Sequence, residues 1–178
     1  MAGSMNNIAQ YSFPNAVLVT DRFHVQKLAT EAVQEIRIKH RWEAIDMEND
    51  AIEKAKKNKK VFRPIVLENG DTIKQLLARS RYVLYKNDTK WTASQKERAK
   101  LLFNLYPDID SASQLSQKLS WIYENTKDKI YGYTRLAQWH ETVAKAGFKS
   151  FNTISRTIKI HYKTILNFIQ FKGINLNF

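Results

Sequence analysis

Apolar residues recur every three or four positions along most of the chain, which is the period of an amphipathic helix. The longest such stretch covers residues 23 to about 57 and contains no Gly or Pro. The same period predicts further helices over residues 72–85, 92–105, 107–122 and 133–146, and a last helix that starts at residue 150. Thr92 and Gln95 have the spacing of a capping box, and Gly147 is placed as a C-cap. The pattern predicts a mostly helical protein.

One segment departs from this helical pattern. Residues 17–20 form a short apolar, mostly β-branched run, which is typical of a strand inside a covered sheet. Asp21 follows at a strand-to-helix junction, where parallel α/β sheets bind ligands. Because Asp is also a preferred N-cap, Asp21 is either a ligand-binding carboxylate or the cap of the long helix. The strand has no evident neighbour, so we expect its edges to pair with a second copy, giving a homodimer, or with residues 65–67.

The excess of basic over acidic residues indicates what kind of partner the protein binds. The 178 residues include 29 Lys and Arg against 17 Asp and Glu, a formal net charge of +12. This balance favours an anionic partner, most often nucleic acid, over a merely soluble basic protein. The chain has no Cys, which excludes disulfides, thiol nucleophiles and Cys-based zinc sites and fits a cytoplasmic location. No apolar stretch approaches the roughly 20 residues of a membrane-spanning helix.

The C-terminal part of the chain is the main candidate for an anion-binding surface, because no Asp or Glu follows Glu141. The candidate DNA-binding residues there are Lys149, Arg156, Lys159 and Lys163. The alternative is an ordinary basic helix face. A second basic run, residues 54–60, is either a phosphate-contacting patch or a solvated helix end. The four His residues lack the spacing of a helical zinc site, so we expect them to be structural or exposed.

The segment around Asp21 resembles the second-aspartate segment of bacterial insertion-sequence transposases of the ISL-three type. The matching residues are Phe13-Pro14-Asn15-Ala16 and Val19-Thr20-Asp21-Arg22-Phe23-His24-Val25, followed in order by Asn69-Gly70-Asp71-Thr72, Leu76-Leu77-Ala78-Arg79-Ser80-Arg81-Tyr82, Trp91 and Gly147-Phe148-Lys149-Ser150-Phe151-Asn152-Thr153. These enzymes carry an Asp-Asp-Glu triad on an RNase H-like fold. The resemblance implies that Asp21 is a catalytic residue and metal ligand, in a site where two Mg²⁺ (or Mn²⁺) ions assist phosphodiester displacement. It implies double-stranded DNA, the transposon ends, as the partner.

The first Asp and the Glu of this triad have no counterpart in the sequence. We therefore expect a transposase fragment that is inactive and free of metal by itself, since one carboxylate holds Mg²⁺ weakly. The expected fold class is mostly α, with an N-terminal βα piece of an RNase H-like fold followed by a helical insertion-type bundle. Its parts are an expression scar and start at residues 1–5, the βα remnant with the long helix at 6–60, and the helical insertion domain at 61–178. Two alternatives stay open: a stand-alone basic helical DNA-binding module without catalysis, and a helical interaction protein with no nucleic-acid role.

Overall fold

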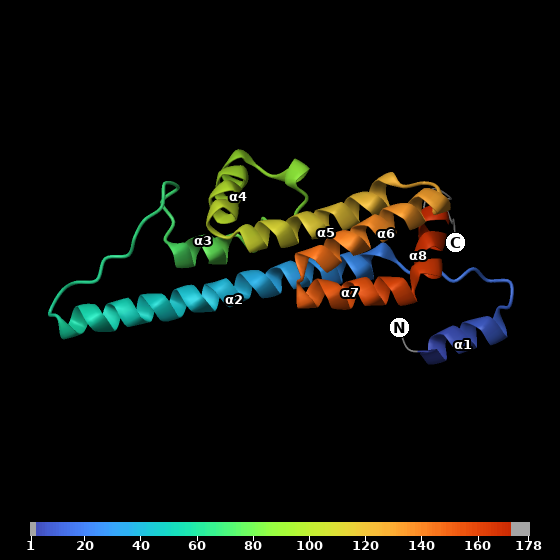
Figure 1. Ribbon diagram of the computed structural model, residues 1–178, viewed down its shortest axis with the longest axis horizontal. Coiled ribbons are helices and arrows are strands. Elements are labelled where there is room, and N and C mark those ends of the chain that lie inside the picture. The colour runs from blue at the N-terminus through green and yellow to red at the C-terminus, as the bar shows by residue number, and fades with distance from the viewer. Residues whose placement is uncertain (1–2, 172–178) are drawn as a thin grey trace. The chain divides into compact units, whose positions relative to one another are not determined.

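The computed structural model describes residues 3–171, and the regular elements of this part of the chain are helices (Figure 1). They are α1 (Gly3–Ser12), α2 (Arg22–Lys57), α3 (Ile73–Arg79), the short 3₁₀ helix η1 (Asp88–Lys90), α4 (Ala93–Leu105), α5 (Pro107–Asn125), α6 (Lys129–Ala146), α7 (Lys149–Ile160) and α8 (Tyr162–Phe171). The mostly helical part of the prediction is confirmed, including the long helix α2. Within residues 3–171, no helix combines the length and the apolarity needed to cross a bilayer.

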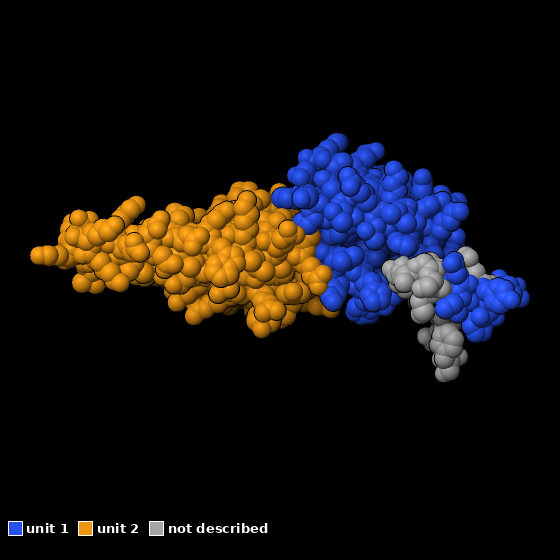
Figure 2. Space-filling model, turned by 90° about the horizontal axis from the view of Figure 1, so that it is seen from below, with its two compact units in different colours: residues 1–29, 118–178 blue, residues 30–117 orange. Residues whose placement is uncertain are grey.

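The chain divides into two compact units (Figure 2). Unit 1 contains the described residues up to Ala29 and from Lys118 onward, whereas unit 2 runs from Thr30 to Gln117. Both divisions fall inside helices, one in α2 and one in α5. The chain therefore passes between the units through helical residues rather than through loops.

The predicted N-terminal βα piece was wrong. Residues 16–21 have no regular secondary structure, and the described residues form only an isolated bridge, between Val66 and Thr72. A strand needs a ladder of backbone hydrogen bonds to a neighbouring strand. Here α8 takes the neighbour's place: the Thr20 N–H donates to the Thr164 carbonyl oxygen at 3.1 Å, and the Asn167 side-chain amide donates to the Leu18 carbonyl oxygen at 2.9 Å.

Unit 1 is organised around α6, α7 and α8, each of which contacts the other two. Helices α6 and α8 approach closely at Gly132, where a Cβ atom would lie 3.0 Å from Leu166 Cδ2 and 3.1 Å from Ile169 Cδ1. The side chains of Trp139 and Phe151 are fully buried in the same unit. A residue without a side chain thus lets α8 lie against α6 and complete this core.

Two helix boundaries in unit 1 differ from the prediction. Helix α6 starts one turn earlier than expected, because the Asp128 carboxylate accepts hydrogen bonds from the N–H groups of Ile130 and Tyr131 at 2.8 and 3.0 Å. Gly147 ends α6 in the left-handed conformation, with φ of 74°, as expected of a C-cap. The last predicted helix is two helices that meet at His161, where the sequence offers no Gly or Pro as a local signal.

In unit 2, α3 stops at Arg79, well before the predicted residue 85. Two side chains of α2 bind the carbonyl groups at this end: Arg37 Nη1 donates to the Leu77 oxygen at 2.8 Å, and Gln34 Nε2 donates to the Arg81 oxygen at 3.1 Å. These long-range bonds replace the bonds that a further helical turn would make. At the other end of α3, Thr72 and Gln75 form a capping box, as Thr92 and Gln95 do for α4.

Candidate nucleic-acid interface

Asp21 is exposed and directly precedes α2. Its Oδ1 accepts a hydrogen bond from the Phe23 N–H at 3.0 Å, which is the geometry of an N-cap. The cap interpretation from the sequence is therefore confirmed. A cap of this kind contributes about 1 kcal/mol to helix stability, and it leaves the carboxylate accessible to solvent.

The residue before Asp21 fixes its position relative to α8. The Thr20 side chain is buried, with its hydroxyl oxygen 2.5 Å from that of Thr164. Thr164 directly follows Lys163 in the chain. Asp21 and Lys163 are thus the chain neighbours of two hydrogen-bonded threonines. The sequence had indicated these two residues for separate reasons.

Three other predicted DNA-binding residues lie on α7. Lys149 and Arg156 are seven positions apart, so they lie on one face of the helix, and Lys159 is less than a turn further on. All three side chains are exposed, whereas the opposite face buries Phe151, Ile154, Ser155 and Ile158 in unit 1. The ion pairs of residues 3–171 include none to these three residues or to Lys163. The positive charges of α7 and α8 thus face solvent without carboxylate partners.

His140 lies at the contact between α6 and α7, close to the positive charge of Lys159. The His140 ring is hydrogen-bonded to the buried hydroxyl of Ser155, which joins the two helices. Burial lowers the pKa of His140, and the positive charge of Lys159 lowers it further. His140 is thus structural, as expected from the sequence.

The donor set around Asp21 does not fit a two-metal site. Such a site needs several carboxylates converging on the ions, yet residues 3–171 contain no group of three or more His, Asp or Glu placed to hold a metal ion. No catalytic step is therefore assigned to these residues, and Mg²⁺ binding by Asp21 stays a prediction from the family resemblance.

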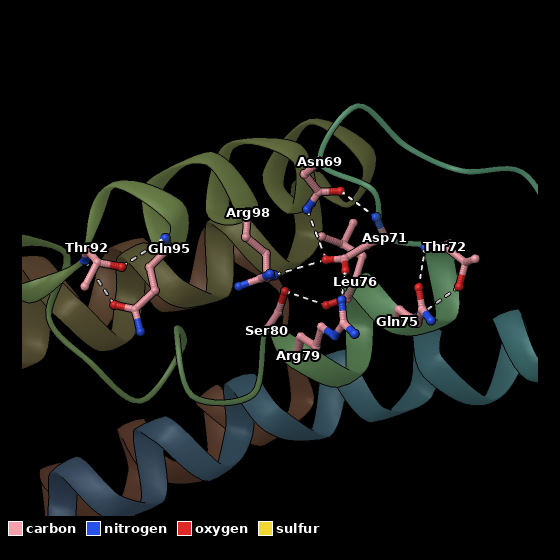
Figure 3. Close-up of polar contacts among 10 residues, drawn as sticks. All are labelled: Asn69, Asp71, Thr72, Gln75, Leu76, Arg79, Ser80, Thr92, Gln95 and Arg98. Carbon is pink, nitrogen blue, oxygen red and sulfur yellow. Dashed lines mark hydrogen bonds and ion pairs between the residues drawn. The ribbon is translucent and has the colours of Figure 1, made fainter.

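A buried ionic cluster in unit 2 has no counterpart in the predicted site. The Asp71 carboxylate is 1% exposed, and it pairs with Arg79 and, at 3.1 Å, with Arg98 Nε (Figure 3). The Asn69 amide adds a hydrogen bond at 3.0 Å, and Gly70, with φ of 79°, provides the turn that brings Asn69 and Asp71 together. Burial acts to raise the pKa of Asp71, but the hydrogen bonds and charges of Arg98 and Arg79 outweigh it and lower this pKa below its usual value. The cluster joins the turn to α3 and α4, so we assign it a structural role.

Comparison with protein families agrees with the resemblance around Asp21. A family model described as Transposase, for DDE enzymes of the ISL-three type, matches residues 1–176. No curated protein and no solved structure shows a significant match.

Proposed function

The chain belongs to the transposase family of the ISL-three type, and on this premise we propose that it binds DNA through the cationic face of α7 and α8. The observation that carries the proposal is the Thr20–Thr164 contact, because it joins the residue before Asp21 to α8, in the C-terminal stretch that has several basic residues and no carboxylate after Glu141. A DNA strand that follows this face would neutralise the four unpaired charges with its phosphates. The net charge of +12 favours the same partner.

We further propose that Asp21 is the second aspartate of the family's triad. It stands at the matching place in the sequence, it is exposed, and it lies beside the proposed DNA surface. With two further carboxylates, such a residue would bind divalent ions that activate the attacking oxygen. The described residues bring no such carboxylates to Asp21, so the proposed activity of this chain by itself is DNA binding in the cytoplasm, without strand transfer.

Removing charge from the α7–α8 face tests the DNA-binding proposal. The double substitution Lys159→Gln and Lys163→Gln is expected to weaken binding to a duplex oligonucleotide, because two phosphates are no longer neutralised. Each lost phosphate contact makes the negative slope of log K against log salt shallower by about 0.9. The magnitude of the slope should therefore decrease by nearly 2, as measured by fluorescence anisotropy between about 50 and 200 mM salt.

A matched control removes two charges elsewhere in unit 1. Lys118 and Lys127 are exposed and lie in α5 and in the loop after it, and their double Gln variant should keep the wild-type slope. Equal decreases in both double variants would show that only net charge matters. No binding by the wild-type chain at 50 mM salt would favour the helical interaction protein.

Asp21 is tested with an assay for DNA cleavage and strand transfer in the presence of Mg²⁺ or Mn²⁺. We expect no product from the wild-type chain or from Asp21→Ala, because a single carboxylate holds these ions weakly. Asp21→Asn, which keeps an oxygen for the Phe23 N–H, separates the loss of charge from the loss of the cap. Cleavage that depends on Asp21 would contradict the proposal that this chain binds DNA without cutting it.

A further inference from the structure

Unit 2 contains a buried positive charge without a carboxylate partner. The Arg37 side chain is 4% exposed, and its guanidinium donates to the side-chain oxygen of Gln34 at 2.6 Å and to the carbonyl oxygen of Leu77 at 2.8 Å. Both acceptors are uncharged. A buried charge is costly unless an opposite charge compensates it, so Arg37 leaves an uncompensated positive charge in this part of unit 2.

Two more arginines add to this charge. Burial lowers the pKa of Arg37, and the charges of Arg41 and Arg81 lower it further, while Tyr85 acts in the opposite direction. Arg41 lies one helical turn after Arg37 on α2, and Gln34 joins Arg37 to the Arg81 carbonyl, so the three arginines are neighbours. The ion pairs of the described residues include none to any of the three. Unit 2 does pair other arginines, since Asp71 binds Arg79 and Arg98. The three arginines at residues 37, 41 and 81 are thus a distinct cationic cluster.

Exposed aromatic rings accompany the cluster. Tyr82 is 68% exposed and Tyr85 is 49% exposed. The Arg81 guanidinium lies 5.8 Å from the centroid of the Tyr82 ring, within cation–π distance. Rings beside unpaired arginines offer stacking surfaces for bases together with donors for phosphates.

We propose that Arg41, Arg81, Tyr82 and Tyr85 form a second nucleic-acid contact surface, here called the arginine–tyrosine surface, which takes the phosphodiester backbone on its arginines and a base on a tyrosine. The proposal rests on the proposed function, since it supposes that the chain binds DNA, but it concerns unit 2 instead of α7 and α8. A protein partner with acidic side chains would satisfy the arginines, but it would not require two exposed rings. The exposed rings therefore favour nucleic acid, and in particular an unpaired strand whose bases are free to stack.

Arg37 and Gln34 are positioning residues for this surface. Arg37 holds the Leu77 carbonyl and Gln34 holds the Arg81 carbonyl, at 2.8 and 3.1 Å. The two bonds end α3 and keep the backbone of residues 80–82 against α2. The surface therefore depends on the same bonds that shorten α3 relative to the sequence prediction.

The experiment measures binding of the full chain to a labelled single-stranded oligonucleotide and to a duplex, by fluorescence anisotropy at several salt concentrations. Replacing Arg41 and Arg81 by Gln should reduce the magnitude of the negative slope of log K against log salt for the single strand by about 1.4, at about 0.7 for each phosphate that is no longer neutralised. Replacing Tyr82 and Tyr85 by Ala should weaken single-strand binding at least about fivefold, the smallest effect expected for one stacked base. The tyrosine change should affect duplex binding much less, because the bases of a duplex are already stacked.

Several outcomes would overturn the inference. One is wild-type binding to both oligonucleotides by the Arg and Tyr variants while their thermal unfolding is unchanged. Another is an equal decrease in binding by a control that replaces the exposed Lys96 and Lys100 of α4 by Gln. A third is equally tight binding of polyglutamate that does not respond to the tyrosine changes, which would point to an acidic protein partner.

The variants of the two units also separate this inference from the proposed function. If the Lys159 and Lys163 variant loses binding while the Arg41 and Arg81 variant keeps it, the inference fails and the proposed function stands. The reverse result would support the arginine–tyrosine surface and contradict the proposed role of α7 and α8. Weaker binding by both variants would support both proposals.

Discussion

Replacing Asp71 by Asn is expected to lower the free energy of unfolding by about 3 kcal/mol, because it removes one partner of a buried ion pair. The carboxylate is 1% exposed and is shared by Arg98, whose side chain is 20% exposed, and Arg79, whose side chain is 56% exposed. Asn keeps the shape and can still bond to its neighbours, but it leaves the charge of Arg98 without compensation. Since Arg79 is well solvated, we place the effect at the lower end of the range for buried pairs. Urea denaturation at pH 7 measures it.

The pH dependence gives this prediction a second readout. The pKa of Asp71 in the folded chain lies below its ordinary value of 3.8. The stabilisation is therefore complete above about pH 4 and is lost as the pH falls through the folded-state pKa. The wild-type chain should lose stability over this acidic range, and the Asp71→Asn variant should show a flatter profile.

The two arginines provide matched controls. Arg98→Gln should cost more stability than Arg79→Gln, because Arg98 is the more buried partner. A destabilisation below about 1 kcal/mol for Asp71→Asn, well under the range for buried pairs, or the same pH profile for variant and wild type, would contradict the structural role of the cluster.

Replacing Gly132 by Val should destabilise the chain by about 2 kcal/mol, a cost typical of overpacking in a close-packed core. Even a Cβ atom would lie within about 3 Å of the Leu166 and Ile169 side chains, and the two further methyl groups of Val require α8 to move away from α6. Because α8 also holds Thr20 and Leu18, binding to duplex DNA should weaken as well. Thermal unfolding and the anisotropy assay measure the two effects.

Two related variants test the cause of this destabilisation. Gly132→Ala should be nearly neutral, because the better helix propensity of Ala, up to about 1 kcal/mol, offsets a small shift of Leu166. Leu166→Ala combined with Gly132→Val should be more stable than the sum of the single changes predicts, since it removes one of the clashing side chains. Additive effects would show that the two residues do not compete for the same space.

The sequence predicted those parts of the fold that depend on local signals. Two such signals were confirmed: the capping box of Thr92 and Gln95, and the left-handed C-cap at Gly147. Both depend only on residues that are close together in the sequence. The strand at residues 17–20 was wrong, because β-branched composition shows that a segment suits a ladder but cannot supply the second strand. The early end of α3 depends on Arg37 and Gln34, whose bonds to α3 and the residues after it span 40 and 47 positions, and no local pattern predicts such bonds.

In the candidate site, too, the sequence predicted what depends on local signals and missed what depends on tertiary contacts. Lys149, Arg156, Lys159 and Lys163 could be proposed from the sequence because the lack of carboxylates after Glu141 is visible there. The sequence could not predict which arginines of unit 2 pair with a carboxylate. In the sequence Arg79 and Arg81 look equivalent, yet Arg79 pairs with Asp71 whereas Arg81 has no ion pair among the described residues. Only the tertiary contacts distinguish a structural arginine from one that is available to an anion.

The division of the chain inside α2 and α5 has a consequence for the order of folding. Unit 2 is continuous in sequence, so all of its residues are synthesised before α6, α7 and α8. Unit 1 needs both its N-terminal segment and α8, and its N-terminal segment must wait until the last helices emerge. We therefore expect unit 2 to complete its core first during synthesis, and the Thr20–Thr164 contact that positions Asp21 to be among the last to form.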